Sequence, residues 1–133
     1  MNKTNKSIAI VLMVLGGIFV VAGAVTWTSV SSELKAANIT VAEDAEHFAG
    51  QEVRGPLTAY AEAEIINEHA LKATGGKTYA ELEREDPTRA TAMNASFLRS
   101  SLYTSVVAFG VALMSIGVGV SVALTGVAVY RKA

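Results

Sequence analysis

Two histidines with acidic neighbours are the residues of this chain that could carry chemistry. His47 and His69 each have carboxylates nearby: Glu43 and Asp44 before the first, and Glu64 and Glu68 before the second. Two histidines and one carboxylate are the ligand set of many non-haem iron oxygenases. No HExxH or similar spacing supports such a site, and the two histidines are far apart in sequence. We therefore expect surface histidines, with no metal site and no cofactor.

Other catalytic arrangements are equally unsupported. The chain has no cysteine, which excludes thiolate chemistry, disulfides and cysteine-ligated metals. No nucleophile elbow accompanies the histidines, so a Ser-His-Asp site is not indicated. The net charge is −1, which is not typical of a nucleic-acid-binding protein. The sequence predicts a protein that is not an enzyme and has no nucleic-acid partner.

The acidic residues are confined to the middle of the chain, between Glu33 and Asp86. Four of them lie within ten residues and could form an acidic docking surface: Glu43, Asp44, Glu46 and Glu52. A clustered field of this kind can steer a basic partner. The alternative is a solvated face without a partner, which is the commoner role of such a cluster.

Two uncharged apolar runs flank the acidic part of the chain. The first, residues 8–30, is long enough as a helix to cross a hydrocarbon core of about 30 Å. A cleavable signal peptide is the alternative, but the run exceeds a usual h-region, so we expect an uncleaved anchor. The second run, residues 100–130, would form about 46 Å of helix. Its membrane-spanning part is therefore expected mainly at residues 106–129.

Charge bias predicts the orientation of the two spans. The terminal segments, residues 1–7 and 131–133, carry lysine and arginine but no acidic residue. Positive charges are retained on the cytoplasmic side, so both termini are expected in the cytoplasm. Residues 31–99 are then extracytoplasmic, although Lys35 and Arg99 near the span ends oppose this orientation. The predicted location is the plasma membrane, with two passes.

Glycines recur at seven-residue spacing in both runs. The candidates for helix packing are Gly16, Gly23, Gly110, Gly117, Gly119 and Gly126. Small residues let helix backbones approach closely inside a membrane, although glycine is also simply common there. The second run has glycines on more than one face, so we expect it to contact the first helix and a second protein. Neither run contains Lys, Arg, His, Asp or Glu, which argues against a transporter or proton channel.

The middle segment is predicted to be mostly helical. Residues 57–73 form a helix between Pro56 and the Gly75-Gly76 stop, with an apolar stripe that includes Leu57 and Ile65. A capping box at Thr78 predicts a short helix to about residue 85. A third helix starts at Pro87 and continues into the second span. Residues 38–41 are predicted to be extended, and residues 43–48 are predicted to form a brief helical turn. The fold class is therefore all-α, a two-transmembrane hairpin with a small, mostly helical extracytoplasmic domain.

Four segments carry a resemblance to a known family: AEDAEHFAG (42–50), GPLTAYAEAEIINEHAL (55–71), ATGGKTYAELERED (73–86) and MNASFLRSSLYTSVVAFGV (93–111). They resemble a family of small two-span actinobacterial membrane proteins. Many members carry the name aromatic ring-opening dioxygenase, which the residues of this chain do not support. Some similar two-span proteins are accessory subunits of the cytochrome bcc–aa3 respiratory supercomplex.

The resemblance implies a non-catalytic accessory subunit that supports assembly or stability of that supercomplex. Its partners would be cytochrome bcc and aa3 oxidase subunits, together with the lipid bilayer. The alternative is a free-standing envelope protein whose extracytoplasmic domain binds a ligand or a signal. A third possibility, an iron dioxygenase, would be supported only by the name that many family members carry.

Overall fold

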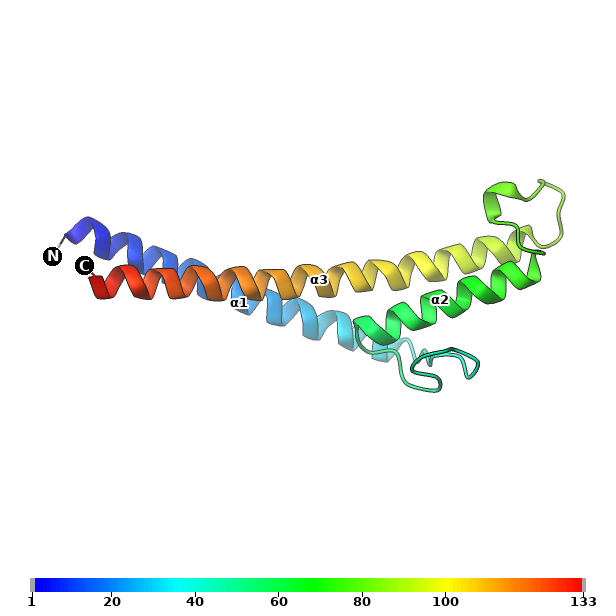
Figure 1. Ribbon diagram of the computed structural model, residues 1–133, viewed down its shortest axis with the longest axis horizontal. Coiled ribbons are helices and arrows are strands. Elements are labelled where there is room, and N and C mark those ends of the chain that lie inside the picture. The colour runs from blue at the N-terminus through cyan, green and yellow to red at the C-terminus, as the bar shows by residue number, and fades with distance from the viewer. Residues whose placement is uncertain (1, 133) are drawn as a thin grey trace. The chain divides into compact units, whose positions relative to one another are not determined.

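The computed structural model describes residues 2–132, and this part of the chain is all-helical. The elements follow the order α1 (Lys3–Ala36), α2 (Pro56–Ala73), the 3-10 helix η1 (Tyr79–Glu81) and α3 (Arg89–Lys132) (Figure 1). The described residues form no strand, and one isolated antiparallel bridge joins Thr40 to Glu52. The predicted all-α class is confirmed. Met1 and Ala133, at the ends of the predicted cytoplasmic segments, lie outside the described residues.

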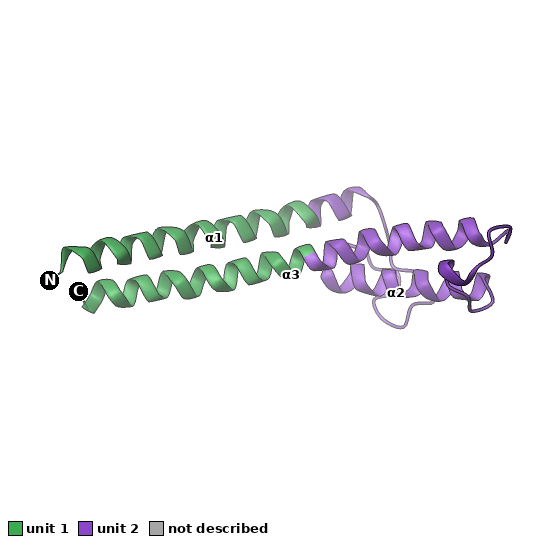
Figure 2. Ribbon diagram, turned by 90° about the horizontal axis from the view of Figure 1, so that it is seen from above, with its two compact units in different colours: residues 1–30, 108–133 green, residues 31–107 purple. Residues whose placement is uncertain are grey.

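The chain divides into two compact units (Figure 2). Unit 1 comprises residues 1–30 and 108–133, and unit 2 comprises residues 31–107. Helices α1 and α3 contribute residues to both units, whereas α2 and η1 belong to unit 2.

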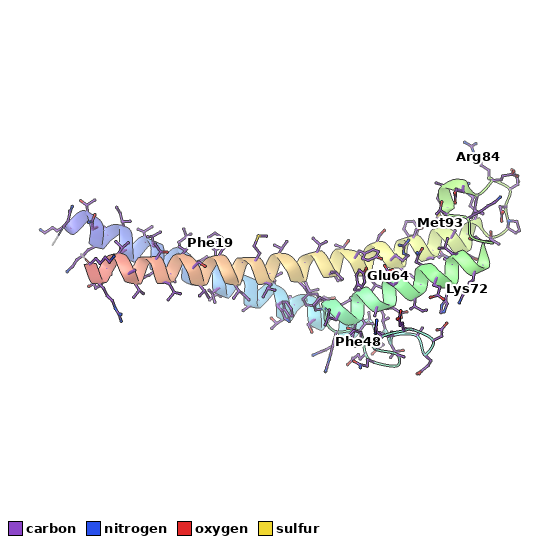
Figure 3. All side chains as sticks on the ribbon, viewed as in Figure 1. Phe19, Phe48, Glu64, Lys72, Arg84 and Met93 are labelled. Carbon is purple, nitrogen blue, oxygen red and sulfur yellow. The ribbon has the colours of Figure 1, made fainter. Side chains whose placement is uncertain are left out.

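Unit 1 is a pair of antiparallel helical segments that lie side by side (Figures 1 and 2). Trp27 and Phe109 meet edge to face with ring centroids 4.7 Å apart, and Phe109 is only 1% exposed. In each of α1 and α3, however, only 17% of the most apolar window is buried. Valine, leucine, isoleucine and phenylalanine side chains, such as Phe19 in Figure 3, remain exposed along both helices. Both helices are long and apolar enough to cross a membrane.

Helix α3 begins upstream of the apolar run because its start is capped. The Asp86 carboxylate accepts hydrogen bonds from the Thr88 amide at 2.8 Å and from the Thr88 hydroxyl at 2.6 Å. These bonds form a side-chain turn directly before the helix, of the kind that aspartate favours at such positions. The helix starts at Arg89, two residues after the predicted start at Pro87, and then continues without a break to Lys132.

Helix α2 confirms the helix predicted for residues 57–73. Pro56 occupies its first turn, where a missing N–H costs nothing. Its C-terminus is closed by a hydrogen bond from the Gly76 amide to the Leu71 carbonyl at 2.7 Å. Gly75 has φ +67°, a left-handed conformation that favours glycine and ends the helix.

The buried face of α2 differs from the predicted stripe. Leu57 is 66% exposed, whereas Ala59 and Ala63 are fully buried and Ile65 is 4% exposed. The prediction for Leu57 was wrong, because the packed face of α2 passes through Ala59 and Ala63 and not through Leu57. Alanines at four-residue spacing lie on one helix face and allow close packing there, so the larger leucine is left outside.

The segment after α2 is less helical than predicted. The Thr78 amide donates to Glu81 Oε2 at 2.7 Å, as the capping spacing indicated, but η1 ends at Glu81 rather than near residue 85. Leu82 leaves helical geometry and buries its side chain, and its carbonyl accepts a hydrogen bond from Arg89 at 2.9 Å. Tertiary packing of Leu82 therefore stops the helix.

The segment between α1 and α2 is held by backbone pairing rather than by a helical turn. The Val41 amide donates to Gln51 O, and the Val53 amide donates to Ile39 O, both at 2.8 Å. Val41 and Val53 are 1% and 0% exposed. Residues 39–41 supply this pairing, whereas Asn38 lies in a turn with φ +54° and is not extended as predicted. Residues 43–48 form turns and bends and not the predicted helical turn.

Candidate functional site

Gly16 and Gly119 lie at a close approach of α1 and α3 in unit 1. A Cβ atom built on Gly16 would lie 2.5 Å from the Gly119 carbonyl oxygen and 2.6 Å from the Ala123 amide nitrogen. A Cβ on Gly119 would lie 2.6 Å from the Gly16 carbonyl oxygen. Both distances are shorter than any real Cβ contact, so only glycine fits at these two positions.

Two further glycines continue this contact along both helices. A Cβ on Gly23 would lie 2.5 Å from the Ala112 carbonyl oxygen, and one on Gly126 would lie 2.8 Å from the Ala9 carbonyl oxygen. The four glycines therefore form a single line of close backbone approach within the hairpin. This is the role that small residues serve between membrane helices.

Gly110 and Gly117 are placed differently. Apart from its chain neighbours and the backbone of its own helical turns, no atom of the described residues lies within 4 Å of a Cβ built on either of them. Met114, between them in sequence, is 68% exposed. These two glycines thus belong to an open face of α3 that the α1–α3 contact does not use, and we call Gly110, Met114 and Gly117 the open face.

Within residues 2–132, one side-chain hydrogen bond joins the two helices in unit 1. The Ser115 hydroxyl donates to the Phe19 carbonyl at 2.8 Å. Thr26, Ser121 and Thr125 instead donate to carbonyls of their own helices. The sequence alone does not indicate which residue of α1 lies opposite Ser115, so this contact has no local signature.

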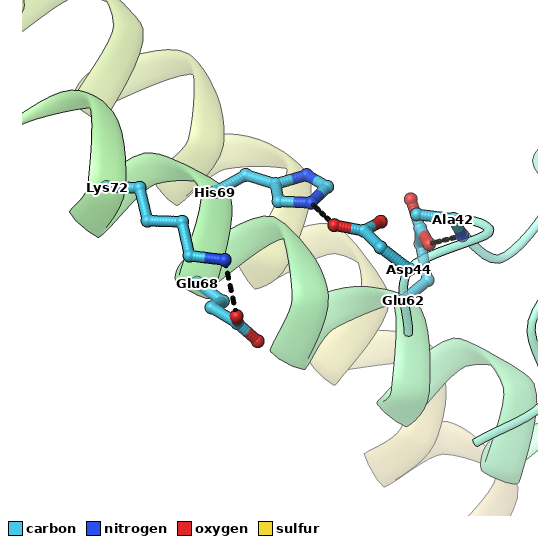
Figure 4. A network of polar contacts seen from close by, with 6 residues as sticks. All are labelled: Ala42, Asp44, Glu62, Glu68, His69 and Lys72. Carbon is cyan, nitrogen blue, oxygen red and sulfur yellow. Dashed lines mark hydrogen bonds and ion pairs between the residues drawn. The ribbon is translucent and has the colours of Figure 1, made fainter. Parts of the chain in front are cut away.

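In unit 2, His69 connects the acidic segment to α2 (Figure 4). Its Nε2 atom lies 2.6 Å from Asp44 Oδ2. The hydrogen bond from His69 lowers the pKa of the exposed Asp44 carboxyl. Glu62 makes a second connection, because its carboxylate accepts a hydrogen bond from the Ala42 amide at 2.9 Å. Partial burial raises the pKa of Glu62, and the Ala42 bond opposes that rise.

The four acidic residues of the predicted docking surface have different surroundings. Asp44 is engaged by His69, while Glu46 is 90% exposed and lies 4.0 Å from the His47 ring. Glu52 takes part in the bridge to Thr40, and Glu43 lies close to Gly50. Within residues 2–132, no group of three His, Asp or Glu side chains is placed to hold a metal ion.

A shallow apolar groove lies beside the acidic segment. It has a volume of about 170 Å³ and is lined mainly by Phe48, Leu57, Tyr60 and Ile65, with Glu64 and Glu68 at its side. Phe48 has φ +59°, which is uncommon for a large side chain. Tyr60 also packs against Tyr103, whose hydroxyl donates to Glu64. None of these contacts was predicted, because each joins residues far apart in sequence.

Comparisons with protein-family models, curated proteins and solved structures find no match to this chain.

Proposed function

We propose that this protein is a non-catalytic accessory subunit of a membrane-embedded complex. In this proposal α1 and α3 span the plasma membrane, both termini are cytoplasmic and residues 31–99 are extracytoplasmic. The exposed apolar side chains of unit 1 support a lipid environment, since a soluble protein buries helices of this composition.

The observation that carries the proposal is the open face of α3. On α3, Gly119 and Gly126 are used by contacts inside the hairpin, whereas a Cβ built on Gly110 or Gly117 would contact no other part of the described residues. Glycines on a lipid-facing surface gain nothing from lipid, whereas they let a second helix approach closely. We therefore place the contact with the partner subunit at this face.

The identity of the complex rests on the resemblance of residues 42–111 to small actinobacterial membrane proteins. On that basis the proposed partners are the cytochrome bcc and aa3 oxidase subunits of a respiratory supercomplex. The proposed role is assembly or stability, which requires packing surfaces rather than reactive groups.

Purification of a tagged chain in mild detergent tests this function. Haem proteins should co-purify with the parent chain and be lost from Gly117→Leu. Gly17→Leu is the matched control, because a Cβ on Gly17 also meets nothing within 4 Å but lies on α1. Recovery of the parent chain without any haem protein would contradict the respiratory assignment.

Orientation is tested separately with single cysteines, which the cysteine-free chain makes unambiguous. An impermeant thiol reagent should label a cysteine at Lys77 in intact cells but not one at Lys132. The reverse pattern would contradict the proposed topology.

A docking role for the acidic surface is tested with Glu43→Gln, Glu46→Gln and Glu52→Gln together, because Asp44 is already paired with His69. A purely structural subunit predicts a change in electron-transfer rate of less than about twofold at low salt. A larger fall, with a parent rate that declines as salt is added, would indicate charge-steered docking.

The apolar groove favours a second candidate, a free-standing envelope protein that binds a ligand or signal. Phe48, Leu57 and Tyr60 offer exposed apolar surface for such a ligand. This candidate predicts that the tagged chain purifies without partner proteins. It also predicts that Tyr60→Ala abolishes ligand binding without changing the amount of chain that is purified.

A further inference from the structure

Arg99, in the unit 2 part of α3, has a donor without a partner. Its Nε atom is buried, and no hydrogen-bond acceptor for it exists within residues 2–132. Arg89, by contrast, donates to the Leu82 carbonyl at 2.9 Å and to the Tyr79 hydroxyl at 3.1 Å. A buried charged donor without a partner is costly. The environment of Arg99 therefore calls for an acceptor that these residues do not supply.

Arg99 lines a small polar cavity between α2, α3 and the segment that precedes η1. The cavity has a volume of about 50 Å³, and its polar lining comes from Asn67, Lys77, Thr78, Tyr79, Ser96 and Arg99. A single water needs about 10–15 Å³, so the space holds several waters or one tetrahedral oxyanion. None of the described residues that line the cavity is acidic.

The charges around the cavity favour an anion. Lys77 and Arg99 are its two cations. The neighbouring carboxylates have other donors, since Glu81 accepts the Thr78 amide and Glu64 accepts the Tyr103 hydroxyl. Neither carboxylate forms an ion pair with Lys77 or Arg99.

Cation–π contacts fix the orientation of Arg99 and of Tyr79, which both line the cavity. The guanidinium of Arg99 lies 5.6 Å from the centroid of the Tyr103 ring, and that of Arg89 lies 4.4 Å from the centroid of Tyr79. Cation–π contacts of this kind favour one side-chain orientation. The arginine is thus oriented before any ligand arrives, which lowers the entropic cost of binding.

We propose that this cavity binds one phosphate-sized oxyanion, with Arg99 and Lys77 as its cationic ligands. The planar fork of a guanidinium matches phosphate oxygens, and lysine adds a point charge. The side-chain amide of Asn67 adds a neutral donor on the lining. The proposal concerns unit 2 alone and does not depend on the identity of any partner subunit.

The position of Arg99 favours a dissolved anion over a lipid phosphate. Arg99 precedes Val106, the start of the proposed span, by seven residues, or about 10 Å of helix. The polar headgroup region extends only about 5–8 Å beyond the hydrocarbon core. The cavity, which also reaches residues further upstream on α3, therefore lies on the aqueous side of the headgroups.

The test is a titration of the delipidated full chain, in phosphate-free detergent solution, with inorganic phosphate. Backbone amide NMR signals of Thr78 and Ser96 report on binding in every variant, and the parent signals should shift to saturation. Arg99→Gln should weaken binding at least about tenfold, as expected for a charged hydrogen bond. Lys77→Gln should weaken it by a smaller factor, and it keeps the fold because Lys77 is exposed.

Arg84→Gln is the matched control, because Arg84 is an exposed arginine of the same segment that does not line the cavity (Figure 3). It should bind phosphate as the parent does. Unsaturable shifts in the parent, or equal affinity in Arg84→Gln and Lys77→Gln, would overturn the proposal even if Arg99→Gln failed to fold.

A second arm separates the two sources of phosphate. The chain in phosphatidylglycerol nanodiscs, without added phosphate, should show the same Thr78 and Ser96 signals as in detergent, and phosphate should then shift them. Signals already shifted by the lipid, and unmoved by phosphate, would overturn the assignment to a dissolved anion and give the site to a lipid headgroup.

Discussion

Unit 1 and unit 2 are stabilised by different kinds of contact. In unit 1 the helices meet through glycines whose backbones approach within van der Waals distance, and a single hydroxyl, that of Ser115, joins them. In unit 2 a short helix and two connecting segments are joined by polar contacts over a small core of valine, alanine, isoleucine and leucine. The close helix contact of unit 1 depends on glycines, with the Trp27–Phe109 pair beside it, whereas unit 2 depends on buried side chains and polar contacts.

This difference predicts opposite responses to substitution. Unit 1 should be most sensitive to added volume, because space is lacking at its contact. Unit 2 should be most sensitive to lost volume and lost acceptors, because its core is small and its connecting segments rely on individual hydrogen bonds.

Gly119→Leu should separate α1 from α3 in unit 1. A Cβ at this position would lie 2.6 Å from the Gly16 carbonyl oxygen, and the obstacle is backbone that cannot move alone. We expect a cost of about 3 kcal/mol or more, at the upper end for overpacking. Fluorescence of Trp27, the single tryptophan, should report loss of its contact with Phe109.

Gly117→Leu is the control for that experiment. It adds the same side chain two residues away, on the open face, and should leave the Trp27 emission of the isolated chain unchanged. Equal effects of the two variants would show that the α1–α3 contact is not where the structure places it.

Ile65→Ala should destabilise unit 2 by about 2–3 kcal/mol, the lower part of the range for removing a buried isoleucine side chain. Leu57→Ala, on the same helix but 66% exposed, should cost less than about 0.5 kcal/mol. Hydrogen exchange of the α2 amides in micelles measures both. A larger effect at Leu57 would indicate that the apolar stripe predicted from the sequence is the buried face of α2.

The glycines of unit 1 and the buried face of α2 show which features could be predicted from the sequence. Seven-residue glycine spacing and long uncharged runs are local patterns, so the helices and the glycine faces followed from periodicity alone. Periodicity could not show which glycine face contacts the other helix. Gly117 and Gly119 are equivalent in the sequence pattern, although only Gly119 lacks space for a side chain.

Unit 2 was harder to predict because its contacts join distant residues. The helix at 56–73 followed from its proline start and glycine stop. The hydrogen bonds from Ser31 to Arg54, from Ala42 to Glu62 and from Tyr103 to Glu64 have no local signature. The same holds for the cavity beside Arg99, whose lining comes from three separate segments.

Ser115→Ala should have a small effect on unit 1. It removes the hydrogen bond to the Phe19 carbonyl, and such bonds between membrane helices contribute about 0.6 kcal/mol on average. Ser121→Ala is the control, because its hydroxyl bonds only within its own helix. Unfolding in mixed micelles should distinguish the two variants, and a loss of several kcal/mol at Ser115 would mean that polar contacts matter more in unit 1 than we argue.

The smallest expected effect is a pH-dependent loosening of the acidic segment in unit 2. The hydrogen bond with His69 holds the pKa of Asp44 below its usual value of 3.8, so this contribution is present above about pH 4 and is lost as pH falls through the lower folded-state pKa. Amide exchange in residues 42–50 should therefore quicken, relative to its intrinsic pH dependence, only under strongly acidic conditions. Asp44→Asn should remove this change, whereas Glu46→Gln, at a 90% exposed side chain, should preserve it.

Both groups of the His69 contact are about half exposed, so the effect should be confined to this segment and leave α2 protected. If α2 lost protection at the same pH, the contact would be part of the core of unit 2, and the contrast between a volume-limited hairpin and a unit with separable surface contacts would fail.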